Sequence, residues 1–199
     1  MKRWEIIIIS LCLIIFSIIC FLVCNYEVLD IDMLLYNYVN LHIRGDFFTS
    51  LFSLITYFGG FFFIFLMALL IFIFSKKYRW FITLDIAFCS LLNYFIKLLV
   101  LRPRPINSLI SENGYSFPSG HTMISVAFYG IIIYLIFKNV KTKYLRYSLS
   151  FILLLFIFLI AFSRIYLSVH YFTDVLSALL LGLAYLIVYI NIYKGVTHT

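Results

Sequence analysis

The chain has 199 residues, of which 65% are hydrophobic and only 12% are charged, and its mean hydropathy is +1.10. Soluble domains contain about 45–50% apolar and about 25% charged residues, and a soluble globule of this size cannot bury such an excess of apolar surface. The composition excludes a disordered chain, a small disulfide-rich secreted protein and a soluble nucleic-acid-binding protein. What remains is a polytopic membrane protein, in which the formal charge of +7 is first a signal of topology.

Six segments are long and apolar enough to form transmembrane helices, which need about 20 largely apolar residues. Five carry no charge, and the third contains only Asp85 and Lys97; in chain order the segments are 6–24, 47–75, 80–101, 122–137, 147–163 and 175–193. The second is long enough to span with tilt or with an interfacial lead-in. We therefore predict an all-α fold with six spans and a single domain over residues 1–199.

The segment between the first two spans, residues 29–50, has its own pattern. Its apolar residues follow helical spacing, and polar residues lie between them. The apolar residues are Ile31, Leu34, Leu35, Tyr38 and Val39, and the polar residues are Asp30, Asp32, Asn37 and Asn40. This spacing predicts a short interfacial amphipathic helix.

The distribution of basic residues predicts the orientation. With six spans, one side of the membrane receives ten of them: Lys2, Arg3, Lys76, Lys77, Arg79, Lys138, Lys141, Lys143, Arg146 and Lys194. The positive-inside rule makes that side cytoplasmic, so both termini are predicted inside the cell and the chain in the cell membrane. No small-residue cleavage site follows the first span, which we interpret as an uncleaved anchor.

Polar residues that depart from this pattern gather in two loops. All three prolines, Pro103, Pro105 and Pro118, fall between the third and fourth spans, and the third span should end near Leu101 because a residue before proline disfavours helix. The second cluster lies around the junction of the fifth and sixth spans and contains Ser163, Arg164, His170 and Asp174. By parity both loops face the extracytoplasmic side, so we expect the two clusters to meet there.

The two clusters are rich in cations and poor in acids. The cations are Lys97, Arg102, Arg104 and Arg164, and the only nearby carboxylates are Glu112 and Asp174. Such a concentration of charge fits a polyanion, and phosphate is the natural one because arginine binds its oxygens bidentately. Ser119 and Gly120 open the fourth span, where free backbone N–H groups favour phosphate.

Two histidines supply the chemistry. His170 and Asp174 are four residues apart and share a helix face, so the carboxylate can orient the imidazole and leave its other nitrogen free to attack phosphorus. His121, in the other cluster, can protonate the leaving oxygen. His42 and His198 have no such neighbours and are interpreted as solvated.

The sequence predicts catalysis with no metal and no cofactor. It offers no cluster of carboxylates to hold Mg²⁺, so arginine and lysine would neutralise the charge of the transition state. The cysteines lie in or beside apolar runs without CxxC spacing and are interpreted as small apolar side chains; they are Cys12, Cys20, Cys24 and Cys89.

Three segments resemble the signature motifs of the type 2 phosphatidic acid phosphatase (PAP2) superfamily. They are Lys97-x6-Arg104-Pro105, Pro118-Ser119-Gly120-His121 and Ser163-Arg164-x5-His170-x3-Asp174, all within 97–174. The resemblance implies that His170 is the nucleophile that forms a phosphohistidine, that Asp174 orients and activates it, and that His121 is the general acid. The phosphoryl oxygens would be bound by Lys97, Arg104, Arg164 and the backbone of Ser119 and Gly120. Arg102 lies outside the motifs, and it is either a contact to a second phosphate or an interfacial residue.

The resemblance implies an integral membrane lipid phosphatase whose partners are a lipid phosphate and membrane lipids, with no nucleic acid. Small six-span members of bacterial type act on undecaprenyl pyrophosphate, phosphatidylglycerol phosphate or phosphatidic acid, and we favour the first two. Three alternatives stay open: a lipid phosphotransferase with the same intermediate, a non-catalytic lipid transporter or scramblase, and a haloperoxidase, whose known members are soluble.

Overall fold

The computed structural model describes residues 1–197, in which all regular structure is helical; His198 lies outside the described residues. The helices are α1 (Arg3–Tyr26), α2 (Asp30–His42), α3 (Asp46–Tyr57), α4 (Phe61–Phe74), α5 (Arg79–Val100), α6 (Gly120–Asn139), α7 (Lys143–Tyr166) and α8 (Phe172–Thr197). Six stretches of the described chain are long and apolar enough to cross a membrane, with α3 and α4 counted as one. The predicted all-α fold with six spans is confirmed.

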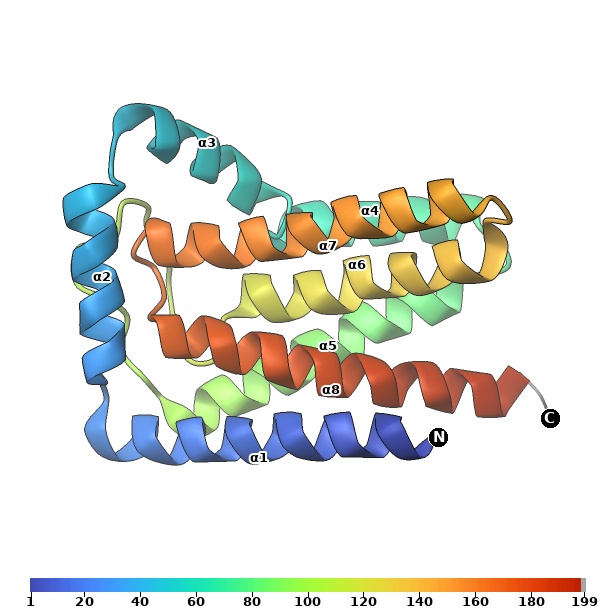
Figure 1. Cartoon of the computed structure of the whole chain (residues 1–199), viewed down its shortest axis with the longest axis horizontal. Coiled ribbons are helices and arrows are strands. Elements are labelled where there is room, and N and C mark those ends of the chain that lie inside the picture. The colour runs from blue at the N-terminus through green and yellow to red at the C-terminus, as the bar shows by residue number, and fades with distance from the viewer. Residues whose placement is uncertain (198–199) are drawn as a thin grey trace.

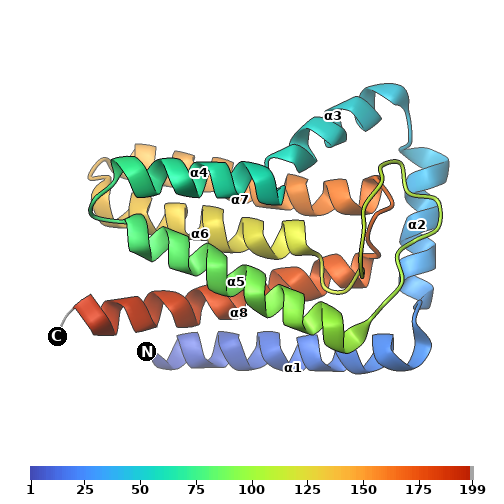
Figure 2. The same ribbon diagram turned by 180° about the vertical axis from the view of Figure 1, so that it is seen from behind.

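The long helices run side by side, and α2 lies across one end of them (Figure 1). The N-terminus and the end of α8 lie at the opposite end of the bundle, as do the α4–α5 and α6–α7 turns (Figures 1 and 2). Helix α6 has the most buried span and contacts α4, α5, α7 and α8. The bundle therefore has one end capped by α2 and one end that carries the N-terminus and the end of α8.

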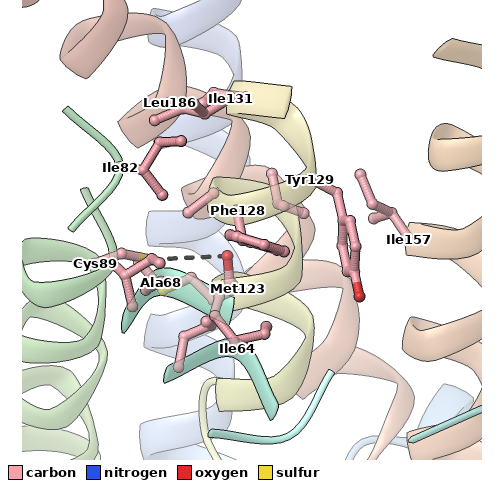
Figure 3. Close-up of a cluster of buried hydrophobic side chains, with 14 of the residues drawn as sticks. Ile64, Ala68, Ile82, Cys89, Met123, Phe128, Tyr129, Ile131, Ile157 and Leu186 are labelled. Carbon is pink, nitrogen blue, oxygen red and sulfur yellow. Dashed lines mark hydrogen bonds between the residues drawn. The ribbon is translucent and has the colours of Figure 1, made fainter. Parts of the chain in front are cut away.

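Apolar side chains from the surrounding helices pack around α6 (Figure 3). Met123 and Phe128 of α6 are almost fully buried. The thiol of Cys89 on α5 donates to the carbonyl of Met123 over 3.7 Å, and all four cysteines are free. This core fixes the α5–α6 and α6–α7 distances and so positions the residues at the capped end.

The predicted second span, 47–75, is broken into α3 and α4 at Phe58–Gly60. A Cβ on Gly59 would lie 2.4 Å from Cγ2 of Ile160 and 2.9 Å from Oγ of Ser125. Only glycine allows the backbone to approach α6 and α7 so closely. The break lets α3 tilt away from the bundle while α4 continues along it (Figure 1).

Helix α2 is the predicted interfacial helix, but the face that it turns to the protein carries both Asp32 and Val39, whereas Asp30 and Asn37 are exposed. Asp32 is 1% exposed and Val39 is 3% exposed, whereas Leu34 and Leu41 are largely exposed. An apolar outward face suits a helix that lies at the membrane interface. The inward position of Asp32 follows from its partners, which are described below.

Candidate active site

A cavity of about 170 Å³ lies at the capped end of the bundle. Its walls come from the α3–α4 break, α5, the loop 101–119, α6 and the α7–α8 loop, through Gly59, Phe61, Lys97, Arg104, Glu112, Gly120, His121, Ile124 and His170. The two polar clusters of the sequence therefore meet around one cavity, as their parity predicted. The loop 101–119 follows the end of α5 at Val100, where Leu101 takes a left-handed conformation.

His170 lies in the α7–α8 loop and is 3% exposed. Its Nε2 is 3.2 Å from Nη1 of Arg104. Because a guanidinium group only donates hydrogen bonds, Nε2 accepts, and the neutral imidazole carries its proton on Nδ1. That Nδ1 lies 3.4 Å from Oδ2 of Asp174, outside hydrogen-bonding geometry; such contacts are commonly long before substrate binds. The lone pair of Nε2 thus points to the cationic side of the site.

Several charges surround His170 and affect its pKa. Burial is the largest cause, and the nearby cations add to it, so the pKa of His170 lies well below its ordinary value of 6.5. The cations are Arg164, Arg104 and Lys97, with His121 as a further contributor. His170 is therefore a neutral imidazole at neutral pH, which is the form that can act as a nucleophile.

Backbone carbonyls hold two of the predicted phosphate-binding cations. Nε and Nη2 of Arg104 donate to the carbonyls of Gly114 and Asn113 over 3.0 and 3.1 Å, and its Nη1 donates to Val169 over 2.9 Å. Nζ of Lys97 donates to the carbonyl of Tyr115. These bonds tie the loop 101–119 to α5 and to the α7–α8 loop, so the loop presents both cations to the cavity.

Glu112 places a carboxylate among these cations. Its Oε1 accepts a 2.6 Å hydrogen bond from Nη2 of Arg164 and lies 4.0 Å from Nε2 of His121, while Oε2 is 4.0 Å from Arg104. Burial raises the pKa of Glu112, but Arg164, His121 and Arg104 outweigh burial and the net pKa is lowered. Glu112 is therefore an anion inside the cavity, and Arg164 reaches the site through it.

The start of α6 contributes Gly120 but not Ser119 to the cavity wall. Ser119 is fully buried, its N–H donates to the carbonyl of Asp174 over 3.1 Å, and its hydroxyl accepts from Thr122. The expected contribution of the Ser119 amide to phosphate binding is not supported, because that N–H is already bonded. A Cβ on Gly120 would lie 3.2 Å from Oδ1 of Asn93, so the backbone here sits close to α5.

Arg102 does not line the cavity. Its side chain is 0% exposed, and it donates to Asp32 of α2 and to Asp174 of α8. The geometry favours neither a contact to a second phosphate nor an interfacial position for Arg102, because its side chain is buried and its donors face protein groups.

Sequence reasoning missed the partners that lie outside the three motifs. Thr56 of α3 accepts from Nη1 of Arg164 over 2.6 Å, and the sequence placed Asp32 only in the polar set of the interfacial helix. No local pattern distinguishes Asp32 from the exposed carboxylate of Asp30. Within residues 1–197, no group of three or more His, Cys, Asp or Glu side chains is placed to bind a metal ion.

Comparison with known proteins agrees with the three motifs. The PAP2 superfamily profile matches residues 78–197. The chain belongs to the PAP2 superfamily. Phosphatidylglycerophosphatase B of Bacillus subtilis (strain 168) is 38% identical over 98 residues, and the match covers 47% of this chain and 47% of that relative. The aligned segment thus spans about half the length of that relative.

Solved PAP2 structures extend the likeness to nearly the whole fold. A transmembrane PAP2 type phosphatidylglycerolphosphate phosphatase from Bacillus subtilis superposes with a TM-score of 0.85 at 25% identity, over 94% of this chain and 96% of that one. LpxE of Aquifex aeolicus superposes with a TM-score of 0.70 at 25% identity, over 83% and 98% of the two chains. The chain is therefore a multi-pass membrane protein with a PAP2 fold.

Proposed function

We propose that this chain is a lipid phosphatase that transfers the phosphoryl group of its substrate to His170 and then to water. One observation carries the proposal: Nε2 of His170 accepts a 3.2 Å hydrogen bond from Arg104 in the wall of a cavity that His121 and Lys97 also line. A nucleophile, a proton donor and phosphate-binding cations thus share one space, which is what phosphoryl transfer requires.

In the first step, Nε2 of His170 attacks phosphorus, an N–P bond forms and the ester P–O bond breaks. Asp174 stabilises the charge that develops on the imidazole through Nδ1. His121 gives its proton to the departing lipid oxygen, so the lipid leaves as an alcohol or as a monophosphate. Lys97, Arg104 and Arg164 neutralise the equatorial oxygens of the phosphoryl group.

In the second step, water attacks the phosphohistidine. His121, now neutral, accepts a proton from the water, the N–P bond breaks and inorganic phosphate leaves. His170 returns to its neutral form, and His121 is protonated again for the next cycle. A lipid hydroxyl in place of water would give a phosphotransferase with the same intermediate.

Phosphatidylglycerol phosphate is the substrate that we favour among the three lipids. The curated relative and the solved structure, both from Bacillus subtilis, carry this substrate in their names. Arg102, the one residue considered for a second phosphate, is buried and does not line the cavity, which gives undecaprenyl pyrophosphate less support. Phosphatidic acid offers the same phosphomonoester with a smaller headgroup.

The lipid tail would lie in the groove between α4 and α5. This apolar groove of about 530 Å³ contains Phe61, Phe65, Ala68, Leu69, Phe72, Trp80, Thr83, Ile86, Ala87 and Ser90. Phe61 also lines the headgroup cavity, so the two spaces meet at that ring. A tail in the groove would place its phosphate beside His121 and His170.

We place the active site at the extracytoplasmic face. The cavity lies at the α2 end of the bundle, opposite both chain ends (Figure 1). The α4–α5 and α6–α7 turns, which carry Lys76, Lys77 and Lys141, lie at the end with the N-terminus and the end of α8 (Figure 2), and Lys138 is in the last turn of α6. The positive-inside rule supports that end as the cytoplasmic one.

Phosphate release by the purified protein in detergent with EDTA tests this function. The substrates are phosphatidylglycerol phosphate, undecaprenyl pyrophosphate and phosphatidic acid, and the matched variant is His170→Ala. We expect wild type to release phosphate, fastest from phosphatidylglycerol phosphate, and His170→Ala to release none while it remains folded. Full activity of His170→Ala would overturn the nucleophile assignment, and transfer of phosphate to an added lipid would identify a phosphotransferase.

A further inference from the structure

All three guanidinium nitrogens of Arg102 donate hydrogen bonds to groups behind the active site. Nε donates to the carbonyl of Glu27 over 2.6 Å, and Nη2 donates to Oδ2 of Asp32 over 2.6 Å. Nη1 donates to Oδ1 of Asp174 over 2.5 Å and to Oγ1 of Thr173 over 2.9 Å. Arg102 itself lies in the loop after α5, and its side chain joins the α1–α2 corner to the start of α8.

Asp32 anchors the same assembly from α2. Its Oδ1 accepts from the backbone N–H of Thr173 over 2.9 Å, in the first turn of α8, where helical N–H groups lack partners within the helix. Its Oδ2 pairs with Arg102, and both side chains are 0% exposed. A buried charge is stable only when it is paired and hydrogen-bonded, so each of these two residues depends on the other.

The carboxylate of Asp174 is held at both oxygens. Oδ1 accepts from Arg102, while Oδ2 accepts from the backbone N–H of Tyr171 over 2.9 Å and lies 3.4 Å from Nδ1 of His170. Rotation of this carboxylate would break the bond to Arg102. Arg102, which holds Oδ1, therefore fixes the direction in which Oδ2 faces the imidazole of His170.

We propose that Arg102 and Asp32 form a positioning pair for Asp174, the residue that orients His170. The inference rests on the proposed function, because it assigns His170 as the nucleophile. Two carboxylates share the one guanidinium group, so the trio keeps one net negative charge for the imidazole. The ring of Tyr171, with its centroid 4.2 Å from the guanidinium carbon, covers the trio.

The charge balance explains why Asp32 is needed. Without its carboxylate, Arg102 and Asp174 would form a one-to-one pair, and the negative charge of Asp174 would be drawn toward the guanidinium group. The charge that develops on His170 during attack would then be less well stabilised. Asp32 touches no residue of the cavity wall in the described contacts, so it acts on the reaction through Arg102 and Asp174.

The test compares Asp32→Asn, Arg102→Lys and Arg102→Met with wild type in detergent. The matched control is Asp30→Asn, which changes an exposed carboxylate two residues away on α2. The measurements are kcat and KM with phosphatidylglycerol phosphate and with undecaprenyl pyrophosphate, the inhibition constant of inorganic phosphate, and thermal unfolding to determine the folded fraction of the enzyme.

We expect kcat per folded enzyme to fall by about 10- to 100-fold in Asp32→Asn and in Arg102→Met, since a slightly misplaced catalytic group slows a reaction by about that much. KM and phosphate inhibition should stay near wild type, because Lys97, Arg104 and Arg164 are intact. Arg102→Lys should recover part of the loss, and Asp30→Asn should match wild type.

Three results would overturn the inference. An unchanged kcat in Asp32→Asn would show that the pair serves folding alone. A rise in KM limited to undecaprenyl pyrophosphate in Arg102→Lys would show that Arg102 contacts a second phosphate. Weakened phosphate inhibition in Asp32→Asn would mean that the cation site, not the carboxylate, had moved. Failure of the proposed function is a separate outcome, because it requires activity in His170→Ala.

Discussion

The carboxylate of Glu112 accepts a 2.6 Å hydrogen bond from the guanidinium group of Arg164. Glu112 is thus an internal anion in the cavity that we assign to the phosphoryl group of the substrate. An incoming phosphate must share Arg164 with this carboxylate and approach it against charge repulsion.

Glu112→Gln should therefore tighten phosphate binding. The amide keeps the size of the side chain but removes the negative charge, and relief of about 1.4 kcal/mol of repulsion would lower the inhibition constant of inorganic phosphate about tenfold. The control is Asp46→Asn, which changes an exposed carboxylate in the first turn of α3. Weaker inhibition in Glu112→Gln would show that the carboxylate helps to hold the cations in place.

The pH dependence of activity should show an acidic limb well below pH 6.5. Burial and the neighbouring cations lower the pKa of His170 from 6.5, so its nucleophilic neutral form persists as the pH falls. Protonation removes the lone pair only when the pH reaches the lowered pKa. The profile of kcat/KM between about pH 4 and pH 8 reports this value for the free enzyme. A limb at or above pH 6.5 would contradict the assignment of the limb to His170.

His170 should also make the stability of the folded protein depend on pH in the acidic range. The unfolded chain protonates His170 near 6.5, whereas the folded chain does so only at lower pH. Between those two values the unfolded state binds more protons, so the free energy of unfolding decreases as the pH falls below 6.5. Thermal unfolding of wild type and His170→Gln in the same buffers checks this. The melting temperature of the wild type should decrease more in acid than that of the variant does.

Filling the α4–α5 groove should affect long-chain substrates alone. Ala87→Trp adds an indole to the groove and should raise KM for a long-chain lipid phosphate, with little change for a short-chain, water-soluble analogue. The matched control is Leu183→Trp, in an apolar cavity of about 300 Å³ that shares no lining residue with the headgroup cavity. Equal effects of the two variants would argue against the groove as the tail site.

Gly59→Ala should be costly although it adds one methyl group. The new Cβ would overlap Ile160 and Ser125, and relief of such overlap typically costs about 1–3 kcal/mol. The shift would also displace the α3–α4 break, which forms one wall of the cavity. Gly45→Ala, where no atom lies within 4 Å of the added Cβ, should lower the melting temperature less. Equal losses would show that packing at Gly59 is unimportant.

Much of the fold can be predicted from the sequence because the thickness of the membrane sets the length of each apolar segment that spans it. The apolar runs located all six spans, five of them uncharged, and Pro103 predicted an end near Leu101 for α5, which ends at Val100. The break at Gly59 was missed because an uninterrupted apolar run looks like a single helix. Its cause is the approach of α6 and α7, which no local pattern records.

The candidate site could be predicted only where its residues are local in sequence. The spacing of His170 and Asp174 predicted that they lie close together, although His170 precedes α8 and does not share a helix face with Asp174. Parity predicted His121 on the same side. Asp32 was missed because a carboxylate on an amphipathic helix is usually solvated, and its burial depends on Arg102. It also lies outside residues 78–197, which the family profile matches. The three motifs therefore describe the wall of the site, and the residues behind it come from elsewhere in the chain.

The bond between Asp32 and Thr173 joins residues 141 positions apart. At a synthesis rate of about 5–20 residues per second, Asp32 is made about 7 to 30 seconds before the first turn of α8. Arg102 is made only about halfway through that interval, and until the interval ends Asp32 has no α8 to receive its carboxylate. The last helix to be inserted completes the site, so a nascent or truncated chain occupies the membrane without an assembled catalytic centre.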